Sequence, residues 1–229
     1  MMTTVHGAFV TLGLMMLASR SEHSHSGTMM TTVRAALVTS GLLMLAACAS
    51  APPTLVALPA PPPAAPSAAA DSAAEPTILL RHVSVPGYLD GFPVVTGRQG
   101  ETLIVAADAE WAERLSDAAG RVLRDALSQR LGPGRVLIEG DGRIPDADLT
   151  IELLTLDPLD GRLALDARWS FVAAGGERAN HSGRTQLDVP LASAQPSAVA
   201  AATAQALGEF ASALAREAAT LRSRSNTPP

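Results

Sequence analysis

One segment of the chain, residues 162–172, places an apolar residue at every second position. A helix would spread such residues around all its sides, so this spacing restricts the segment to a β-strand with one buried face. Between Arg162 and Val172 every second residue is apolar: Leu163, Leu165, Ala167, Trp169 and Phe171. Successive side chains of a strand point to opposite faces of the sheet, so this spacing places all five on one side. The other face is polar, which predicts that it is wet or covered by a partner.

Two further strands flank this one, at residues 148–156 and 178–189. Asp160-Gly161 and Gly175-Gly176 lie between the three segments, where hairpin turns need positive φ. The three strands therefore predict an antiparallel meander. Shorter strands are predicted at residues 78–85, 93–96, 101–106 and 135–138.

Two segments change to the period of an amphipathic helix. The first spans residues 109–131, with Asp108 in position to cap its start and the glycine-proline-glycine run at 132–134 ending it. The second is an alanine-rich segment from about 196 to 221. Two helices on one face of a mixed, mostly antiparallel sheet predict an α+β domain of two layers.

The segment before the domain has the layout of a secretory signal peptide. Residues 29–47 combine a basic residue, Arg34, with an apolar stretch at 35–45 and small residues at the end. The apolar stretch is shorter than the about 20 residues that span a bilayer. It is therefore expected to act as a signal and not as an anchor.

The signal is preceded by a second copy of itself. Residues 1–19 match residues 29–47 at 13 of 19 positions, and Arg20 stands where the second copy has Cys48. We expect translation to begin at the second copy, and residues 1–28 to be a misassigned or discarded extension.

The signal ends in Leu45-Ala46-Ala47-Cys48, which resembles the lipobox of bacterial lipoproteins. In those proteins a diacylglycerol is joined to the thiol, the preceding peptide is removed and the new amino terminus is acylated. A free cysteine can instead be a small buried residue, but the signal before it favours lipidation of Cys48. Two acyl chains, such as palmitate, already anchor a protein stably. Ala49 differs from the aspartate of an inner-membrane retention signal, which favours the periplasmic face of the outer membrane.

The stretch after the cysteine, residues 48–76, is rich in proline and alanine and nearly free of charge, as is typical of an extended tether. Within it, residues 54–58 form a short β-favouring run that can join a sheet. At ~3.1 Å per residue, the path from Pro59 to Pro76 reaches about 50 Å, so the domain at 77–221 is expected to stand well away from the lipid. Residues 222–229 are expected to be a disordered tail.

Charge and motifs exclude several classes of function. The formal net charge is −5, whereas a general nucleic-acid binder needs a basic face. The single cysteine cannot close an internal disulfide. The domain's histidines, His82 and His181, belong to no common catalytic motif, and Ser182 beside His181 lacks the strained turn of a nucleophile. We therefore expect no enzymatic activity.

One group of acidic residues is close in sequence: Asp141, Asp146, Asp148 and Glu152. It lacks the spaced acidic series with a central glycine that forms a calcium loop. We expect no metal, and no cofactor besides the covalent diacylglycerol and amino-terminal acyl chain on Cys48.

Three separated pieces of the domain occur in a characteristic order: VSVPGYLD at 83–90, PVVT at 93–96 and AEWAERL at 109–115. Behind a lipobox and a tether, they resemble the ABC-type transport auxiliary lipoproteins, the PqiC-like family. The resemblance runs from Cys48 through the strand that carries Trp169, and more loosely to the last helix. It departs at Gly91-Phe92, where the family usually continues with arginine and proline.

The resemblance implies an outer-membrane lipoprotein that works with an MCE-domain protein, and often an ABC permease and ATPase, to move lipids between the two membranes. It also implies ring-like homo-oligomers. The protein would be a binding and scaffolding subunit. Two other hypotheses remain: an envelope assembly or stability lipoprotein unrelated to lipid transport, and a periplasmic hydrolase, which lacks a pair of nucleophile and base.

The candidate partner-binding residues are Tyr88, Leu89, Asp90 and Trp111. A rigid amphipathic ring such as that of Tyr88 supplies contact area at low entropic cost. A purely structural interpretation also fits, with Trp111 in the core at a helix start and Tyr88 as a loop anchor.

Overall fold

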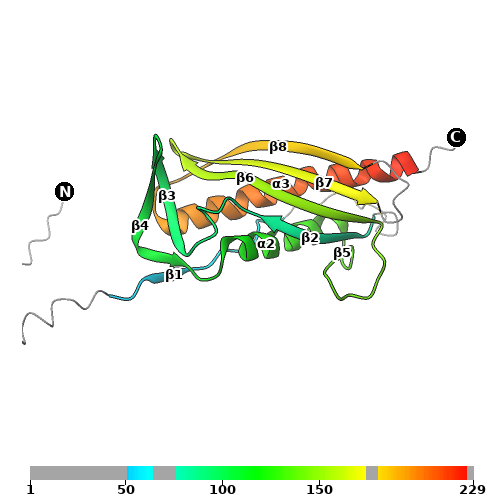
Figure 1. The fold of residues 1–229 in the computed structure, drawn as a ribbon, viewed down its shortest axis with the longest axis horizontal. Helices are drawn as coiled ribbons and strands as arrows, with labels where there is room; N and C mark the ends of the chain where they lie inside the picture. Colours follow the sequence, from blue (N-terminus) through cyan, green and yellow to red (C-terminus); the bar gives the residue numbers. More distant parts are fainter. Residues whose placement is uncertain (1–50, 64–75, 174–179, 226–229) are drawn as a thin grey trace, which may run out of the picture. The chain divides into compact units, whose positions relative to one another are not determined.

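The computed structural model describes residues 51–63, 76–173 and 180–225 of the chain. These residues form two β-sheets and two helices (Figure 1). Cys48, the signal sequence and its copy lie outside the described residues. Of the tail predicted at 222–229, residues 222–225 instead continue the last helix, and residues 226–229 lie outside the described part of the chain.

The larger sheet has the strand order β5-β2-β6-β7-β8 in the described part of the chain. Its strands are β2 (Ile78–Ser84), β5 (Val136–Leu137), β6 (Ala147–Leu159), β7 (Arg162–Ala173) and β8 (His181–Pro190). β2 pairs in parallel with β5 and β6, whereas β6, β7 and β8 form an antiparallel meander, as predicted. The turn from β6 to β7 has positive φ at Asp160 (49°) and Gly161 (75°), which explains the choice of these residues.

A smaller sheet of order β1-β4-β3 accompanies it, where the sequence predicted a single sheet. Its strands are β1 (Thr54–Val56), β3 (Pro93–Gln99) and β4 (Thr102–Trp111). β3 and β4 form an antiparallel hairpin that turns at Gly100, with φ of 55°. The β-favouring run that precedes the domain supplies β1, which pairs in parallel with the end of β4.

The first helix, α2 (Leu115–Leu131), begins six residues later than predicted. Residues 109–111, which were predicted to form the first helical turn, instead form the end of β4. They pair with β1 on one side and with the start of β3 on the other. Trp111 lies opposite Val56 of β1, and its amide nitrogen donates to the carbonyl of Phe92 at 2.6 Å. Trp111 fits both the strand and the helix period, so the sequence pattern did not mark the boundary.

The helices α2 and α3 (Pro196–Ser225) pack on each other and on one face of the larger sheet. Apolar side chains from both helices and from alternate positions of β6 and β7 fill the space between these layers. Among the largest fully buried ones are Ile151, Leu163, Phe171, Leu123, Leu207 and Phe210. The predicted two-layer α+β fold is confirmed, with the second sheet as an addition.

Among the described residues, α3 is the one helix long and apolar enough to cross a bilayer. Its segment Pro196–Thr220 has a mean hydropathy of 1.2, and 61% of the most apolar window is buried inside the domain. A helix in the core of a water-soluble domain has the same composition. Because α3 packs on the sheet and on α2, we interpret it as such a core helix.

The chain that follows β1 is packed against the domain. Leu58 is 3% exposed, and its carbonyl accepts a hydrogen bond from Nη2 of Arg121 at 3.2 Å. Pro61 is buried against α3 at Gly208, where an added Cβ would lie 3.7 Å from the Cβ of Pro61. We call residues 54–61 the N-terminal strap. Part of the predicted tether is therefore fixed to the domain, which shortens the reach expected from sequence.

Candidate functional site

The loop between β2 and β3 carries three of the four predicted partner-binding residues. It starts with a tight turn, in which the carbonyl of Pro86 accepts hydrogen bonds from the amides of Leu89 and Asp90 at 2.8 and 3.2 Å. Leu89 is 4% exposed and lies in the core. Its side chain therefore anchors the loop and is not available to a partner.

Asp90 caps the N-terminus of α2 from outside the helix. Its Oδ1 accepts a hydrogen bond from the amide of Ser116 at 3.3 Å, and its Oδ2 accepts one from Nη1 of Arg114 at 3.2 Å. Hydrogen bonding from Ser116 is the main cause that lowers the pKa of Asp90, and burial opposes it. Trp111 is 4% exposed and bonded to Phe92 through its backbone. Asp90 and Trp111 thus hold the loop in place through these hydrogen bonds. Only part of the predicted docking surface is exposed.

Two aromatic side chains of this loop are open to solvent. Tyr88 is 42% exposed and Phe92 is 51% exposed. Sequence reasoning missed Phe92, although a large apolar residue between turn-forming residues is unusual and was a usable signal. These two rings form the exposed aromatic surface of the loop.

Tyr88 is held by a polar cluster that joins the two sheets. Its hydroxyl lies 2.8 and 2.9 Å from the two carboxylate oxygens of Asp157 on β6. Nη2 of Arg98, on β3, lies 3.1 Å from Oδ2 of Asp157, and the Arg98 guanidinium lies 5.5 Å from the centre of the Tyr88 ring. Burial, and then the hydrogen bond to Asp157, raise the pKa of Tyr88 to about 12.

Sequence reasoning did not find Arg98 and Asp157. Asp157 is only 7% exposed, and a buried carboxylate requires a charged or hydrogen-bonding partner. The signal was an aspartate within an apolar run, Leu156-Asp157-Pro158-Leu159, but nothing in the sequence identified its partners on other elements.

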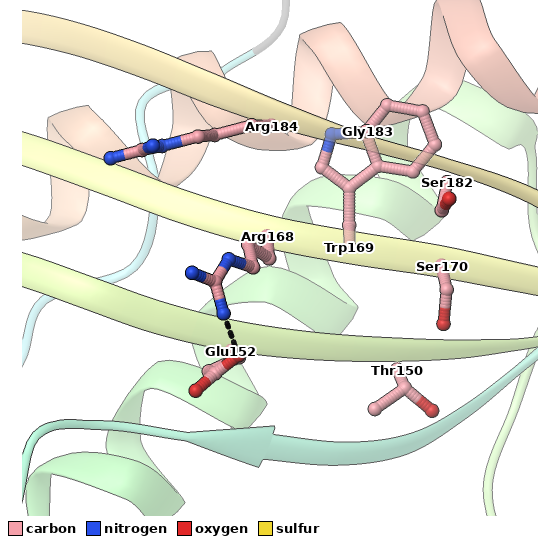
Figure 2. Close-up of a pocket in the computed structure, with 8 residues that line it drawn as sticks. All are labelled: Thr150, Glu152, Arg168, Trp169, Ser170, Ser182, Gly183 and Arg184. Atoms are coloured by element: carbon pink, nitrogen blue, oxygen red, sulfur yellow. Dashed lines mark ion pairs between the residues drawn. The ribbon is translucent and has the colours of Figure 1, made fainter.

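The face of the larger sheet that is turned away from the helices carries a shallow hollow of about 510 Å³ (Figure 2). Its floor includes a row of hydroxyl side chains from neighbouring strands, Thr150, Ser170 and Ser182. Beside it runs a row of charged side chains, Glu152, Arg168 and Arg184. The predicted polar face of β7 is therefore exposed.

The charges around the hollow are paired across the strands. Arg168 lies 3.6 Å from Glu152, and Arg184 binds Asp166 through both Nε and Nη2. The hydrogen bonds from Arg184 are the main cause that lowers the pKa of Asp166 to about 2. Cross-strand pairs of this kind are typical of a solvated sheet face. Around this hollow the charged side chains therefore neutralise one another across neighbouring strands.

His181 and Ser182 are neighbours in β8, but their side chains leave opposite faces of the sheet. Ser182 lines the outer hollow. His181 is on the helix side, with Nε2 2.8 Å from Oε2 of Glu217 and its ring 5.1 Å from that of Trp169. The two residues therefore do not form a pair of nucleophile and base.

The other residues considered for chemistry are dispersed. His82 is exposed on β2. The four clustered carboxylates bind separate partners: Asp141 with Ile138, Asp146 with Thr77, Asp148 with Arg81, and Glu152 with Arg168. Within the described ranges, no group of three or more His, Cys, Asp or Glu side chains is arranged to hold a metal ion.

Solved structures share this fold. An uncharacterized protein of known crystal structure matches with a TM-score of 0.57 at 19% sequence identity, over 73% of this chain and 99% of that chain. Protein XCC0632 from Xanthomonas campestris, of the DUF330 family, matches with a TM-score of 0.55 at 19% identity, over 77% of this chain and 99% of that chain. No protein of curated function is significantly similar in sequence.

The sequence pattern of one protein family covers most of the domain. The family is described as the ABC-type transport auxiliary lipoprotein component, and its pattern matches residues 57–215. The match includes the strap beyond β1, the Tyr88 loop, the larger sheet, strands β3 and β4 of the smaller sheet, and most of α3. The family is defined by a role in transport and as a lipoprotein, which places its members at a membrane of the cell envelope. The chain belongs to the family of ABC-type transport auxiliary lipoprotein components.

Proposed function

We propose that the protein is an outer-membrane lipoprotein, acylated at Cys48, that serves as a binding and scaffolding subunit of an ABC/MCE-type lipid transport system. Family membership is the observation that carries this proposal. The family pattern starts at residue 57, nine residues after the cysteine of a lipobox-like run. The MCE-domain partner, the permease and ATPase, and the outer membrane location rest on the resemblance of the sequence motifs.

The surface proposed for the MCE-domain partner consists of Tyr88 and Phe92. Both rings are exposed, and both sit on a loop held in place by buried Leu89 and by the cap from Asp90 to α2. Rigid aromatic side chains on a fixed loop lose little entropy on binding. Trp111 contributes by fixing the start of β3 through its hydrogen bond to Phe92.

The subunit acts by binding and has no turnover of its own. Two observations on the described residues support this: His181 and Ser182 lie on opposite faces of β8, and the arginines of the outer hollow are paired with carboxylates. The resemblance also supports ring-like homo-oligomers, which sedimentation of the detergent-solubilised protein measures directly.

Affinity purification from membranes tests the proposal. The tagged wild-type protein is expected to retain an MCE-domain protein, and Phe92→Ser, alone or with Tyr88→Ser, is expected to reduce the retained amount several-fold. Val172→Ser is the matched control, since Val172 is an exposed apolar residue on β7 outside the loop. If the wild type retains envelope assembly proteins and no MCE-domain protein, the alternative of an envelope assembly or stability lipoprotein is favoured.

A further inference from the structure

The N-terminal strap determines how far the domain can stand from a lipid anchor. β1 is fixed on one side by its pairing with β4, from Thr54 opposite Ala109 to Val56 opposite Trp111. The amide of Ala112 also donates to the carbonyl of Val56 at 2.9 Å. Beyond β1, Leu58 and Pro61 are buried. The chain is therefore fixed to the domain from residue 54 onward.

Chain length then limits the distance from Cys48 to the domain. Six Cα–Cα steps separate Cys48 from Thr54, and at most about 3.6 Å per step gives an upper limit of about 22 Å. The proline-rich stretch that gave the expected reach of about 50 Å, residues 59–76, begins within the strap and then connects it to β2. It does not separate the domain from the anchor.

The smaller sheet, whose strand β1 begins at this attachment point, carries exposed apolar side chains. Leu55 of β1 is 65% exposed, and Ile104 and Val105 of β4 are 40% and 49% exposed. Leu55 lies opposite Glu110 in the strand pairing, so the sheet also presents a carboxylate. A few exposed apolar side chains do not hold a protein on a membrane by themselves. Leu55, next to the attachment point, can still set the orientation of a protein that an acyl anchor already holds there.

We infer that the smaller sheet, β1-β4-β3, rests on the lipid leaflet that holds the acyl chains, with Leu55 at the contact. In this orientation the charged outer face of the larger sheet does not contact the lipid. This inference rests on the acylation of Cys48 that the proposed function requires. The carboxylate of Glu110 favours a shallow contact with a largely zwitterionic surface over insertion.

Fluorescence quenching by lipid measures this orientation. Cys48 is the only cysteine of the chain and its sulfur is blocked by the thioether, so a cysteine introduced at Leu55 or Ile104 is a unique labelling site. Controls are cysteines at Ile144 and Val172, which are exposed and lie in the β5–β6 loop and near the end of β7, away from β1 (Figure 1). The mature full-length protein is placed in phosphatidylethanolamine and phosphatidylglycerol vesicles that contain a nitroxide-labelled lipid.

Labels at Leu55 and Ile104 are expected to be quenched several-fold more than the two controls. Equal quenching at all four positions, or at none, overturns the inference. A label at Leu55 that is screened from aqueous iodide but not quenched by lipid shows that a second copy of the chain covers this sheet, which also overturns it. A long glycine-serine linker inserted between Ser50 and Ala51 is expected to reduce quenching at Leu55 to the control level.

Mass spectrometry of the same samples separates the two proposals. Acylated protein without differential quenching overturns the orientation and leaves the proposed function intact. Mature protein without acyl chains overturns the proposed function, and the orientation with it.

Discussion

The indole of Trp169 lies so close to Gly183 that a Cβ at Gly183 would be 2.5 Å from Cζ2 of the ring. The two residues are directly paired across β7 and β8. The indole is also fixed at its other atoms, because its Nε1 donates to Oγ1 of Thr185 at 3.1 Å and its ring packs edge-on against Phe171. Trp169 is 6% exposed and has little room to move.

Gly183→Ala is therefore expected to destabilise the domain, although β-strands usually favour alanine over glycine. Overpacking of a filled site typically costs about 1–3 kcal/mol in the free energy of unfolding, which urea denaturation of the purified domain measures. Ser182→Ala, the adjacent residue with its side chain in the outer hollow, is the control and should change stability by less than about 0.5 kcal/mol. Equal stability of the two variants would contradict this packing argument.

The parts of the fold that could be predicted are those that depend on residues close together in the sequence. The meander was predictable because the alternation of β7 and the turn at Asp160-Gly161 are properties of neighbouring residues. The division into two sheets was not, because it depends on β1 pairing with β4 across more than fifty residues of chain. The start of α2 was misplaced for the same reason, since that pairing extends β4 through Trp111.

In the candidate site, too, contacts between residues far apart in the sequence could not be predicted. Tyr88, Asp90 and Trp111 were found from a motif, but their surroundings were not. The partners of Tyr88, Arg98 and Asp157, lie on two different strands, and only the packing of the two sheets brings them together. The exposure of Phe92 and the burial of Leu89 likewise depend on how the loop settles on the core.

Alkaline pH is expected to destabilise the domain through Tyr88. Its pKa in the folded protein is raised to about 12, above the value of about 10 in an unfolded chain. The contribution is complete below pH 10 and is lost between about pH 10 and 12, because the unfolded chain releases its proton first. Tyr88 is the chain's only tyrosine, so ultraviolet absorbance follows its ionisation without interference.

Asp157→Asn tests the cause of this shift. Removal of the carboxylate charge is expected to lower the pKa of Tyr88 partway toward 10, because burial of the ring remains. Loss of the partner of Arg98 should also reduce stability at neutral pH. An unchanged absorbance titration would show that Asp157 does not act on Tyr88.

Acid is expected to weaken the cap on α2. The pKa of Asp90 is lowered in the folded protein, so its contribution is present above the unfolded value of about 3.9 and is lost as pH falls through the lower, folded value. Asp90→Ala should cost about 1 kcal/mol at neutral pH, as is typical for a lost helix cap. Asp90→Asn keeps an acceptor for the Ser116 amide and should cost less.

Unfolding of the three proteins at several pH values provides the measurement. The difference between wild type and Asp90→Asn is expected to shrink as the pH falls below 4. A difference that stays constant down to that range would mean that the charge of Asp90 contributes nothing to the cap.

The strap is expected to detach when the space above Gly208 is filled. A Cβ at this position would lie 3.5 Å from Cδ of Pro62 and 3.7 Å from Cβ of Pro61, which are ordinary contact distances. Gly208→Ala should therefore leave the strap in place, and its better helix propensity can add up to about 1 kcal/mol to stability. Gly208→Leu places three further carbon atoms where the strap runs, and should displace it.

Hydrogen exchange of the β1 amides distinguishes these outcomes. In Gly208→Leu, residues 54–58 should exchange much faster than in the wild type, while the β6–β7–β8 meander stays protected because the strap does not pair with it. In Gly208→Ala, exchange at both places should match the wild type. Since β1 is also the point where the chain leaves for Cys48, a displaced strap lengthens the free tether. The leucine variant should then lose the quenching of a label on the smaller sheet as well, whereas the alanine variant should keep it.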